Sequence, residues 1–559
     1  MKGMSEEGGL SATPEIPELV VEILKARGMA PAEMGVFLYP DYERDLGDPL
    51  LMKDMQAAVD RVFLAAERHE KVVVYGDYDI DGITASAVLM EGLQAYGLEV
   101  TSYIPDRFEE GYGINQAALE KLQAEGAQLV VSVDCGITSV KEAQWARAHG
   151  LDLVITDHHA VGEEIPDALA VLNPKRVGDM YPCKDLAGVG VAFTLVRALQ
   201  RLGGRPTAGQ EKWLLDLVAM GTICDVVPLV GENRVLASFG LKVLRRTRRV
   251  GLRALAEVGG VNIGAISAHE VGFVLGPRMN AAGRLEHAAR SLELVMTSDR
   301  VRAGNIATEL EELNRQRRAD QAAIFAEADE LAAASPDDPV LVLAAPNWSH
   351  GVVGIVASKL AEKWRRPVLL AQVLDEKVKG SARSVPGFNM VEALRSQAHV
   401  LERFGGHFFA AGYTFPLKRL DELRAGLNDY YRQTMSEGGD EAPVVVPEVS
   451  WRDLSRVNHD LLALLELLEP HGNSNPKPVV HLSGLDVLST KVVGNDGKHL
   501  SLKLRDSAGK SLAVIGFGLA ERYNALQLGD KVSVQGNLNK NEFQGRISVQ
   551  MVLSELANE

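Results

Sequence analysis

The sequence predicts an α/β protein: two α/β domains joined by a helical connector, followed by a small C-terminal β-barrel. Over residues 50–172, short runs rich in Val, Ile and Leu alternate with helix-length segments, and the same alternation returns after residue 339. The segment between them is helical in pattern, whereas the end of the chain alternates apolar and polar residues between turns. We therefore expect an N-terminal extension at 1–45, the first α/β domain at 46–233, the connector at 234–335, the second α/β domain at 336–435 and the barrel at 445–559.

Acidic residues end the strand-like runs of the first domain. The runs "KVVVYGD", "AQLVVSVD" and "LDLVITD" finish at Asp77, Asp134 and Asp157, and the helix-length segments between them close with a glycine. Such runs suit parallel strands that are buried on both faces. Because the carboxyl ends of parallel strands meet at one edge, these acids should lie together in space.

The same edge should collect further metal donors. Three carboxylates alternate in "DYDIDG", two histidines follow Asp157, and another aspartate follows the apolar run "WLLDLVAMGTIC". One such aspartate alone is more often a helix cap, but acids at three strand ends beside a His-His pair favour a metal site. The expected donors combine carboxylate oxygens with imidazole: Asp77, Asp79, Asp81, Asp134, His158 and Asp225. This set predicts two divalent cations, Mn²⁺ or Mg²⁺, about 3.5–4 Å apart.

Basic and polar residues in short motifs predict phosphate contacts. The motifs are "PDR", "GPRMNAAGR", "GSARS" and "GGH". Guanidinium groups suit bidentate phosphate binding, and neighbouring glycines let a backbone approach closely, although a lone arginine is more often in a surface ion pair. The candidates are Arg107, Arg278, Asn280, Arg284, Ser381, Arg383 and His407.

The C-terminal part predicts an OB-like barrel. About five strand-like segments, from "LSGLDVLSTKVV" to "GRISVQMVL", are separated by turns, and "LAERYNALQLG" should insert a short helix. Phe517, Tyr523 and Phe543 are candidates for stacking on the bases of a single strand, with burial in the barrel core as the alternative. The barrel could equally dock a partner protein.

Composition limits where the chain works and what it binds. The net charge is −16, yet residues 477–559 carry ten Lys and Arg against eight Asp and Glu, so an acidic chain can still offer a local positive field to nucleic acid. No apolar run is long enough to span a membrane, and the first residues lack the pattern of a signal peptide. Three scattered cysteines indicate a reducing cytoplasm rather than a disulfide framework.

Several motifs resemble those of a known family. "DYDIDG", "SVDCG", "TDHH" and "CDVVPL" resemble the signature motifs of the DHH phosphoesterase superfamily. "YIPDRFEEGYGI", "YPCKDLAGVGVAF", "GPRMNAAGR", "GVVGIVASKL", "GSARS" and "FGGHFFAAG" resemble its RecJ family of single-stranded-DNA-specific 5′→3′ exonucleases. The resemblance implies a DHH domain, a helical connector, a DHHA1 domain and an OB domain around a central cleft.

The resemblance also implies an activity and a setting. The expected activity is metal-dependent hydrolysis of single-stranded DNA to 5′-mononucleotides in recombination, mismatch repair and other DNA repair. We expect a monomer in a bacterial cytoplasm, associated with the nucleoid. Single-strand-binding protein, a RecQ-type helicase and mismatch-repair factors are the implied partners.

Residue roles carry over from the same motifs. Asp79, Asp81, Asp134, His158 and Asp225 match the family's metal ligands, with Asp77 joining them and Asp134 as the candidate bridging carboxylate. His159 matches the second histidine, nearer the substrate, so that Asp134, His158 and His159 form the expected catalytic group. Arg107, Ser381 and Arg383 are the candidates for the 5′-terminal phosphate. The sequence departs from the family at Trp348-Ser349-His350, where the imidazole is shifted by one position.

Two alternatives remain at this point. One keeps the chemistry but shrinks the substrate, as in DHH-type phosphodiesterases of short oligonucleotides, cyclic dinucleotides or pyrophosphate. The barrel and the long connector argue against it. The other is a catalytically inactive DNA-binding scaffold, and the intact set of metal donors argues against that.

Overall fold

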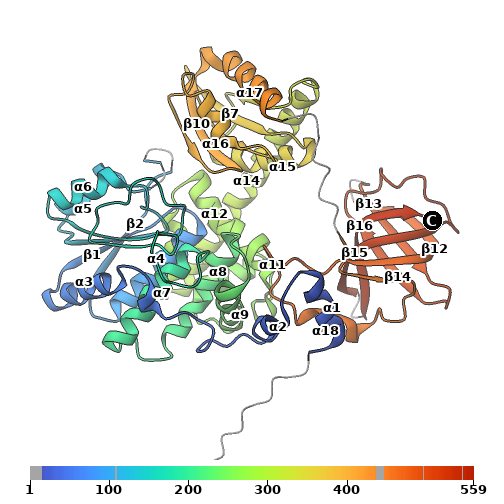
Figure 1. The fold of residues 1–559 in the computed structure, drawn as a ribbon, viewed down its shortest axis with the longest axis horizontal. Helices are drawn as coiled ribbons and strands as arrows, with labels where there is room; N and C mark the ends of the chain where they lie inside the picture. Colours follow the sequence, from blue (N-terminus) through green and yellow to red (C-terminus); the bar gives the residue numbers. More distant parts are fainter. Residues whose placement is uncertain (1–15, 108–109, 112, 436–445, 495–496, 544–545) are drawn as a thin grey trace, which may run out of the picture.

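The computed structural model describes residues 16–107, 110–111, 113–435, 446–494, 497–543 and 546–559. Figure 1 shows the first α/β domain at the left, the second at the top and a β-barrel at the right, with the long helix α14 (Arg300–Ala333) between the two α/β domains. This arrangement confirms the predicted fold class. Within the described residues, no helix combines the length and the apolar character needed to cross a membrane.

A parallel sheet forms the centre of the first α/β domain. Its described strands are β1 (Lys71–Tyr75), β2 (Glu99–Tyr103), β3 (Leu129–Val133), β4 (Asp152–Thr156) and β5 (Ala170–Leu172), in the order β2-β1-β3-β4-β5. Helices α5 (Gln116–Ala124) and α6 (Val140–Ala148) cover one face, and α3 (Met55–Arg68), α4 (Ile80–Gln94) and α7 (Gly188–Gly203) cover the other. Since β1, β3 and β4 are neighbours, the loops that follow them lie side by side.

Helix α4 is enclosed by its neighbours. Almost every residue from Ile80 to Leu93 is buried, and the helix packs on α7 and on α8 (Leu215–Cys224). Two glycines make this close packing possible: a Cβ on Gly92 would lie 2.5 Å from the Val196 side chain, and one on Gly221 would lie 2.4 Å from Thr84 Oγ1. This packing fixes the start of α4 and the end of α8, where the predicted metal donors Asp79, Asp81 and Asp225 lie.

The connector is helical and ends in a helix that both α/β domains share. It comprises α9 (Gly231–Leu244), α10 (Val250–Val258), α11 (Ala268–Glu270), a π-helical turn (Val271–Leu275), α12 (Gly276–Leu285), α13 (Ala289–Met296) and α14. The first half of α14 buries Ile306 and Leu310 in the core of the first domain, and its second half buries Ile324 and Ala328 in the core of the second. One continuous helix therefore sets the spacing between the two domains.

The second α/β domain has a mixed sheet. Its described strands are β6 (Leu341–Ala345), β7 (Val368–Leu374), β8 (Lys377–Arg383), β9 (Arg403–Gly406) and β10 (Ala410–Pro416), in the order β6-β7-β8-β10-β9. Only β6 and β7 pair in parallel among these strands. Helix α15 (His350–Trp364) and the end of α14 cover one face, and α16 (Met390–Ser396) and α17 (Leu420–Thr434) cover the other.

The C-terminal strands close into a barrel. They are β11 (Val449–Trp451), β12 (Val480–Val493), β13 (His499–Arg505), β14 (Ser511–Gly516), β15 (Lys531–Phe543) and β16 (Arg546–Asn558), and pairing of β12 with both β13 and β15 completes the ring. The short helix predicted for residues 519–529 is wrong, because this segment forms turns. Leu556 N donates to the Tyr523 hydroxyl at 3.0 Å, so a contact with the barrel holds the segment where local helix propensity is too weak to decide.

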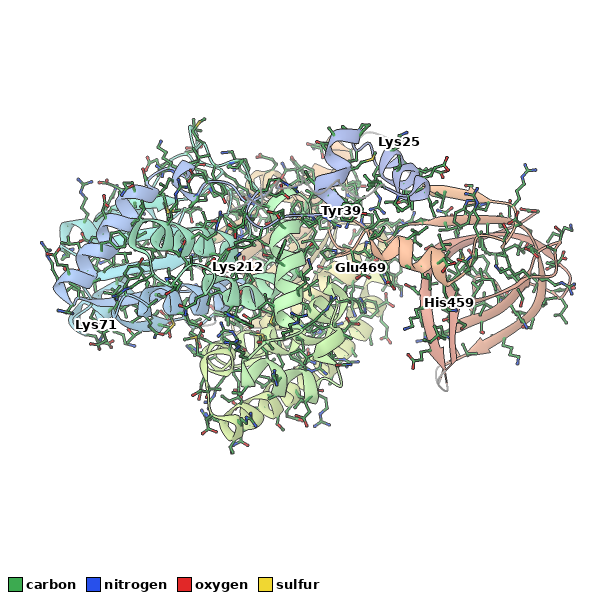
Figure 2. The ribbon with its side chains drawn as sticks, turned by 90° about the horizontal axis from the view of Figure 1, so that it is seen from below. Lys25, Tyr39, Lys71, Lys212, His459 and Glu469 are labelled. Carbon is green, nitrogen blue, oxygen red and sulfur yellow. The ribbon has the colours of Figure 1, made fainter. Side chains whose placement is uncertain are left out.

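The N-terminal segment packs on the barrel. Helices α1 (Glu18–Ala26) and α2 (Pro31–Leu38) share a hydrophobic core with α18 (His459–Glu466) and the barrel strands. Figure 2 shows Tyr39 and Glu469 near each other, between the first α/β domain and the barrel. The buried Arg234 of α9 donates to the carbonyl oxygens of Phe37 at 2.6 Å and Glu469 at 2.8 Å. One guanidinium thus ties three segments that are distant in sequence.

Replacing Arg234 should uncouple the barrel from the first α/β domain. Arg234→Met keeps the apolar stem but leaves the carbonyls of Phe37, Leu468 and Glu469 without their donor, and each hydrogen bond to a charged group contributes about 1.5–3 kcal/mol. We expect calorimetric unfolding to split into two transitions. The exposed Arg302, which pairs with Glu293 at the surface, gives the matched control Arg302→Met with an unchanged thermogram. An unchanged thermogram for Arg234→Met would contradict the coupling.

Candidate metal centre and phosphate-binding cleft

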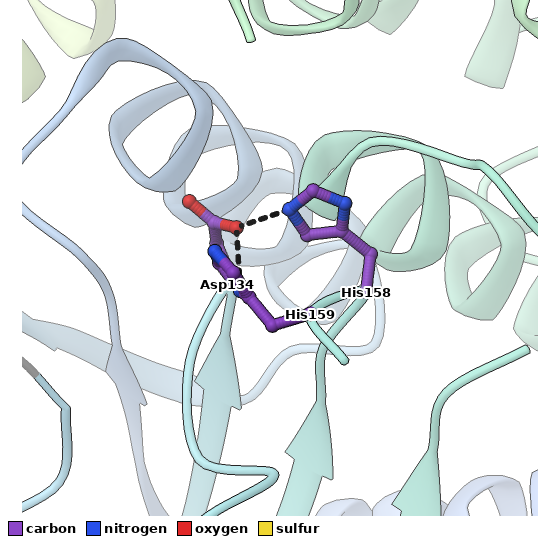
Figure 3. A group of neighbouring side chains, drawn as sticks. All are labelled: Asp134, His158 and His159. Carbon is purple, nitrogen blue, oxygen red and sulfur yellow. Dashed lines mark ion pairs between the residues drawn. The ribbon is translucent and has the colours of Figure 1, made fainter. Parts of the chain in front are cut away.

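Three neighbouring strands bring acidic and imidazole side chains to one edge of the first sheet. Asp77 follows β1, Asp134 follows β3, and Asp157 with the two histidines follows β4. Asp134 has a φ of +59°, a left-handed conformation that is uncommon outside glycine and is found at functional sites. Figure 3 shows the Asp134 carboxylate pointing at the rings of both His158 and His159.

His158 lies at the centre of this group. Its Nε2 is 3.1 Å from Asp134 Oδ1, 3.6 Å from Asp225 Oδ2 and 3.9 Å from Asp81 Oδ2. Burial and the neighbouring His159 lower the pKa of His158 to about 3, so its ring is neutral and keeps the electron pair that a metal ligand needs. Asp225 directly follows α8. This helix places Asp225 beside His158, although the two residues are far apart in the sequence.

Helix ends position the carboxylates of the "DYDIDG" loop. Asp79 Oδ1 caps α4 by accepting from the backbone N–H groups of Asp81 and Gly82. Asp81 in turn accepts from Gly188 N at 2.6 Å and Val189 N at 2.9 Å, at the start of α7. The positive end of the α7 dipole therefore holds one buried carboxylate in place.

The carboxylates repel one another. Burial, and then the charge of Asp79, raises the pKa of Asp81 to about 7, and burial, and then Asp81, raises the pKa of Asp225 to about 9. The pKa values of Asp77 and Asp134 are raised for the same two reasons. The positive groups nearby, His159, Arg107 and Lys175, lower these pKa values but do not cancel the rise. Carboxylates in this situation bind cations.

Asp157 orients His159 instead of facing the other acids. Its Oδ1 accepts from His159 Nδ1 at 2.8 Å and from the backbone N–H groups of both histidines, and its Oδ2 accepts from Ile137 N. Burial alone would raise the pKa of Asp157, but the hydrogen bonds from His159 and the backbone hold it below its ordinary value. Burial alone would lower the pKa of His159, but Asp157 raises it, so the ring is readily protonated.

The donor set fits divalent cations. Three groups of donors each have ligand atoms within 4.8 Å of one another: Asp77, Asp79 and Asp134; Asp81, His158 and Asp225; and Asp134, His158 and His159. Asp77 Oδ1 is buried without a hydrogen-bond donor in the described structure. Gly188 leaves the space, because a Cβ there would lie 2.6 Å from Asp134 Oδ1. Oxygen donors with one or two imidazoles suit Mn²⁺ and Mg²⁺.

A cationic cleft faces this cluster. It has a volume of about 670 Å³ and lies between the two α/β domains, lined by residues that include Arg107, His159, His350, Lys379, Ser381, Arg403 and His407. Arg107, Lys379 and Arg403 form no ion pair with an acidic side chain in the described part of the chain, and Arg107 covers the ring of Tyr78 at 4.8 Å. Burial, followed by Arg107 and Arg403, lowers the pKa of Lys379. Such unpaired, mutually repelling cations are suited to a polyanion.

Four of the predicted phosphate-contacting residues lie in or beside this cleft. Arg107, Ser381 and His407 line it, and Arg383 and Ser381 both lie close to Gly354, where a Cβ would be 3.2 Å from Arg383 Nη2 and 3.3 Å from Ser381 Oγ. Arg284 donates to Gly351 O at 3.1 Å, and burial, then Arg107 and Arg317, lowers its pKa to about 10.

Two further predicted residues make contacts within the protein. Arg278 pairs with Glu311 of α14 and donates to Val274 O. Asn280 Oδ1 accepts from Ile80 N at 2.8 Å and so braces the start of α4. Through Asn280, the "GPRMNAAGR" motif thus stabilises the "DYDIDG" loop, which carries three of the predicted metal donors.

Lys379, Arg403 and His350 line the cleft, although sequence reasoning did not assign them a role. Lys379 lies in β8 and Arg403 in β9, and only the pairing of β8, β10 and β9 brings them together. His350, whose shifted position in the sequence left its role open, begins α15 at the cleft wall. No local pattern marks these residues.

The predicted stacking residues of the barrel differ in their settings. Phe517 is 61% exposed and packs edge-on against His499. Tyr523 packs partly against the barrel core, with its hydroxyl bound by Leu556 N. The side chain of Phe543 lies outside the described residues.

The parallel sheet with its acidic edge and the second α/β domain across a cleft define the DHH class of phosphoesterases. Family models match in the same order: the DHH family N-terminal domain at residues 71–222, the DHHA1 domain at 337–433 and the RecJ OB domain at 452–555. The chain belongs to the RecJ family of single-stranded-DNA-specific exonucleases.

Individual relatives cover nearly the whole chain. The single-stranded-DNA-specific exonuclease RecJ of Bacillus subtilis is 38% identical over 100% of this chain and 69% of its own length. That of Dickeya dadantii is 34% identical over 98% of each. The crystal structure of Thermus thermophilus RecJ in complex with Mn²⁺ is 32% identical, with a TM-score of 0.80, covering 97% of this chain and 78% of that one. The same protein has been solved with Mg²⁺.

Metal and pH should act together on stability. In the folded protein the pKa values of Asp81 and Asp225, about 7 and about 9, lie above their ordinary value of 3.8, so the folded state holds protons that the unfolded chain releases. In EDTA the free energy of unfolding should therefore fall as pH rises from about 4 to about 9, by up to about 1.4 kcal/mol per pH unit for each carboxyl.

Because cations bind the ionised carboxylates, Mn²⁺ should raise the Tm more at about pH 8 than at about pH 5.5. Thermal unfolding followed by circular dichroism measures both trends. Asp225→Asn should flatten the pH slope in EDTA. A stability that increases over this pH range without metal would contradict the account.

Proposed function

We propose that this protein is a metal-dependent exonuclease that hydrolyses single-stranded DNA from the 5′ end to 5′-mononucleotides, in recombination, mismatch repair and other DNA repair. The observation that carries the proposal is the cluster of five carboxylates and one imidazole facing a cleft lined by Arg107, Lys379 and Arg403. The cluster supplies sites for divalent cations, and the cleft suits a phosphodiester chain. Family membership supports the choice of single-stranded DNA.

Two groups of donors would hold the two cations. Asp77 and Asp79 would serve one ion, Asp81, His158 and Asp225 the other, and Asp134, which lies near both groups, would bridge them. When bound, the cations lower the pKa of a water molecule and offset the charge that develops on the phosphate. The protein would keep these donors buried and fixed in position, because Asp79 caps the start of α4 and Asp81 accepts hydrogen bonds from the start of α7.

His159 would act on the substrate. Asp157 fixes its ring through Nδ1 and favours its protonated form, and the ring lines the cleft. A protonated imidazole in this place would donate to a non-bridging oxygen of the scissile phosphate. His407, which lines the cleft from the second domain, would face the same strand.

Arg107, Ser381 and Arg383 would hold the 5′-terminal phosphate. Ser381 Oγ and Arg383 Nη2 both lie close to Gly354, in the first half of α15. A terminal phosphate carries more charge than an internal one, so the guanidinium groups would favour a 5′-phosphorylated end. Arg284 would support this group through its contact with Gly351, at the start of the same helix.

We place the protein in the bacterial cytoplasm, associated with the nucleoid, acting as a monomer. Single-strand-binding protein, a RecQ-type helicase and mismatch-repair factors are the proposed partners. Membership of the RecJ family supports these assignments, and co-purification from a bacterial cell with tagged protein tests them.

A degradation ladder tests the activity. A 5′-phosphorylated single strand labelled at its 3′ end, incubated with Mn²⁺ or Mg²⁺, should shorten progressively, whereas a blunt duplex and an RNA strand of the same sequence should persist. Asp134→Asn and EDTA should each abolish the ladder, because the bridging donor or the cations are lost. Asp421→Asn, which changes an exposed aspartate of α17, is the matched control and should retain full activity.

Two results would contradict the proposed activity. Activity confined to strands of two to five nucleotides would indicate a small-substrate phosphodiesterase, and tight binding without cleavage would indicate a scaffold.

The same assay with a 5′-hydroxyl strand tests the proposed site for the 5′-terminal phosphate. Arg383→Met should reduce the preference for the phosphorylated end by about tenfold or more, because a charge-assisted hydrogen bond is lost.

A further inference from the structure

The tip of the β9–β10 hairpin carries two exposed aromatic rings. Phe408 and Phe409 are 39% and 56% exposed, and their ring centroids are 4.8 Å apart at 62°. Most other phenylalanines of this domain, such as Phe388 and Phe415, are buried in its core. Two adjacent exposed rings on a domain surface have an energetic cost in water, and such exposed apolar groups often mark a contact surface.

The backbone holds the tip rigidly. His407 N donates to Ala410 O at 2.7 Å, Met390 N donates to Phe408 O at 2.9 Å, and Ser384 N donates to Phe409 O at 2.8 Å. Gly406 starts the turn with a φ of +150°, and a Cβ there would lie 2.3 Å from Ala410 O. The turn therefore holds the rings in a fixed position. The free-energy cost of ordering the loop when a ligand binds should be small.

The tip borders the cationic cleft on both of its strands. Arg403 and His407 line the cleft before the rings, and Gly412 and Thr414 line it after them. Burial, followed by the charges of His159 and Lys175, lowers the pKa of His407. Both of these residues belong to the first α/β domain, so the hairpin tip reaches across toward the metal donors.

We propose that Phe408 and Phe409 stack on a nucleobase of the single strand whose phosphates occupy the cleft. The cleft offers cations for phosphate, but the aromatic rings that line it are engaged: Tyr413 is buried, Phe404 packs partly against the core of the second domain, and Tyr78 is covered by Arg107. Exposed rings beside a row of cations are the combination that binds single-stranded nucleic acid. A paired duplex has no free base face to offer, so this contact adds to the selection of single strands.

The inference rests on the proposed function for its ligand, but binding tests it without hydrolysis. In EDTA, fluorescence anisotropy gives the Kd of a 5′-phosphorylated single strand for the wild type, for Phe408→Ala/Phe409→Ala and for Phe408→Tyr/Phe409→Tyr. We expect the alanine variant to bind about tenfold more weakly and the tyrosine variant to bind like the wild type, because tyrosine keeps the ring. Circular dichroism checks that each variant folds.

An abasic strand separates stacking from a general loss of binding. If the rings contact a base, the wild type and the alanine variant should bind a fully abasic strand equally. Phe273→Ala is the matched control, since Phe273 is 73% exposed on the connector, packs on His269 and is not one of the residues that line the cleft. It should leave the Kd unchanged.

The outcomes distinguish the two proposals. An equal Kd for the wild type and the alanine variant, an equal loss on normal and abasic strands, or no binding of single-stranded DNA at all would overturn the stacking proposal. A base-dependent loss of binding by a protein that shows no degradation ladder would keep the stacking contact and reject the exonuclease.

Discussion

The mutual repulsion of carboxylates at one edge of the first sheet is the constraint on which the site depends. Asp77, Asp81 and Asp134 are almost fully buried, and Asp225 is close beside them. Without a cation such groups lower their charge by taking up protons, which explains their raised pKa values. The left-handed backbone of Asp134 lowers the stability of the metal-free fold, and Gly188 leaves room for the Asp134 carboxylate among the other donors.

A second constraint sets the cleft. Because α14 belongs to the cores of both α/β domains, the metal donors of one and the cationic strands of the other are held at a defined spacing. The two surfaces differ in charge: one carries the carboxylates of the metal donors, and the other carries Lys379 and Arg403. The proposed function uses both, because the carboxylates would hold the cations and the basic side chains would bind the phosphodiester, and the shared helix sets the spacing between them.

The sequence was informative where a local pattern determines the structure. Strand-like runs that end in aspartate are sufficient to predict a parallel sheet with an acidic edge, and the "TDHH" and "CDVVPL" motifs add His158 and Asp225. Prediction ended where contacts are long-range. Lys379 and Arg403 meet only through antiparallel pairing, Arg278 turns to Glu311 on α14, and residues 519–529 form turns because the barrel binds them. The packing of α1 and α2 on the barrel joins opposite ends of the chain, which no local pattern reveals.

In the proposed arrangement Asp134 would bridge two cations, and electron paramagnetic resonance of the Mn²⁺-loaded protein tests this most directly. Two Mn²⁺ ions that share a carboxylate at about 3.5–4 Å should give an exchange-coupled spectrum, with two ions bound per chain. In Asp134→Asn the coupling should disappear. A spectrum of single, uncoupled ions in the wild type, or an unchanged coupled spectrum in Asp134→Asn, would contradict the assignment.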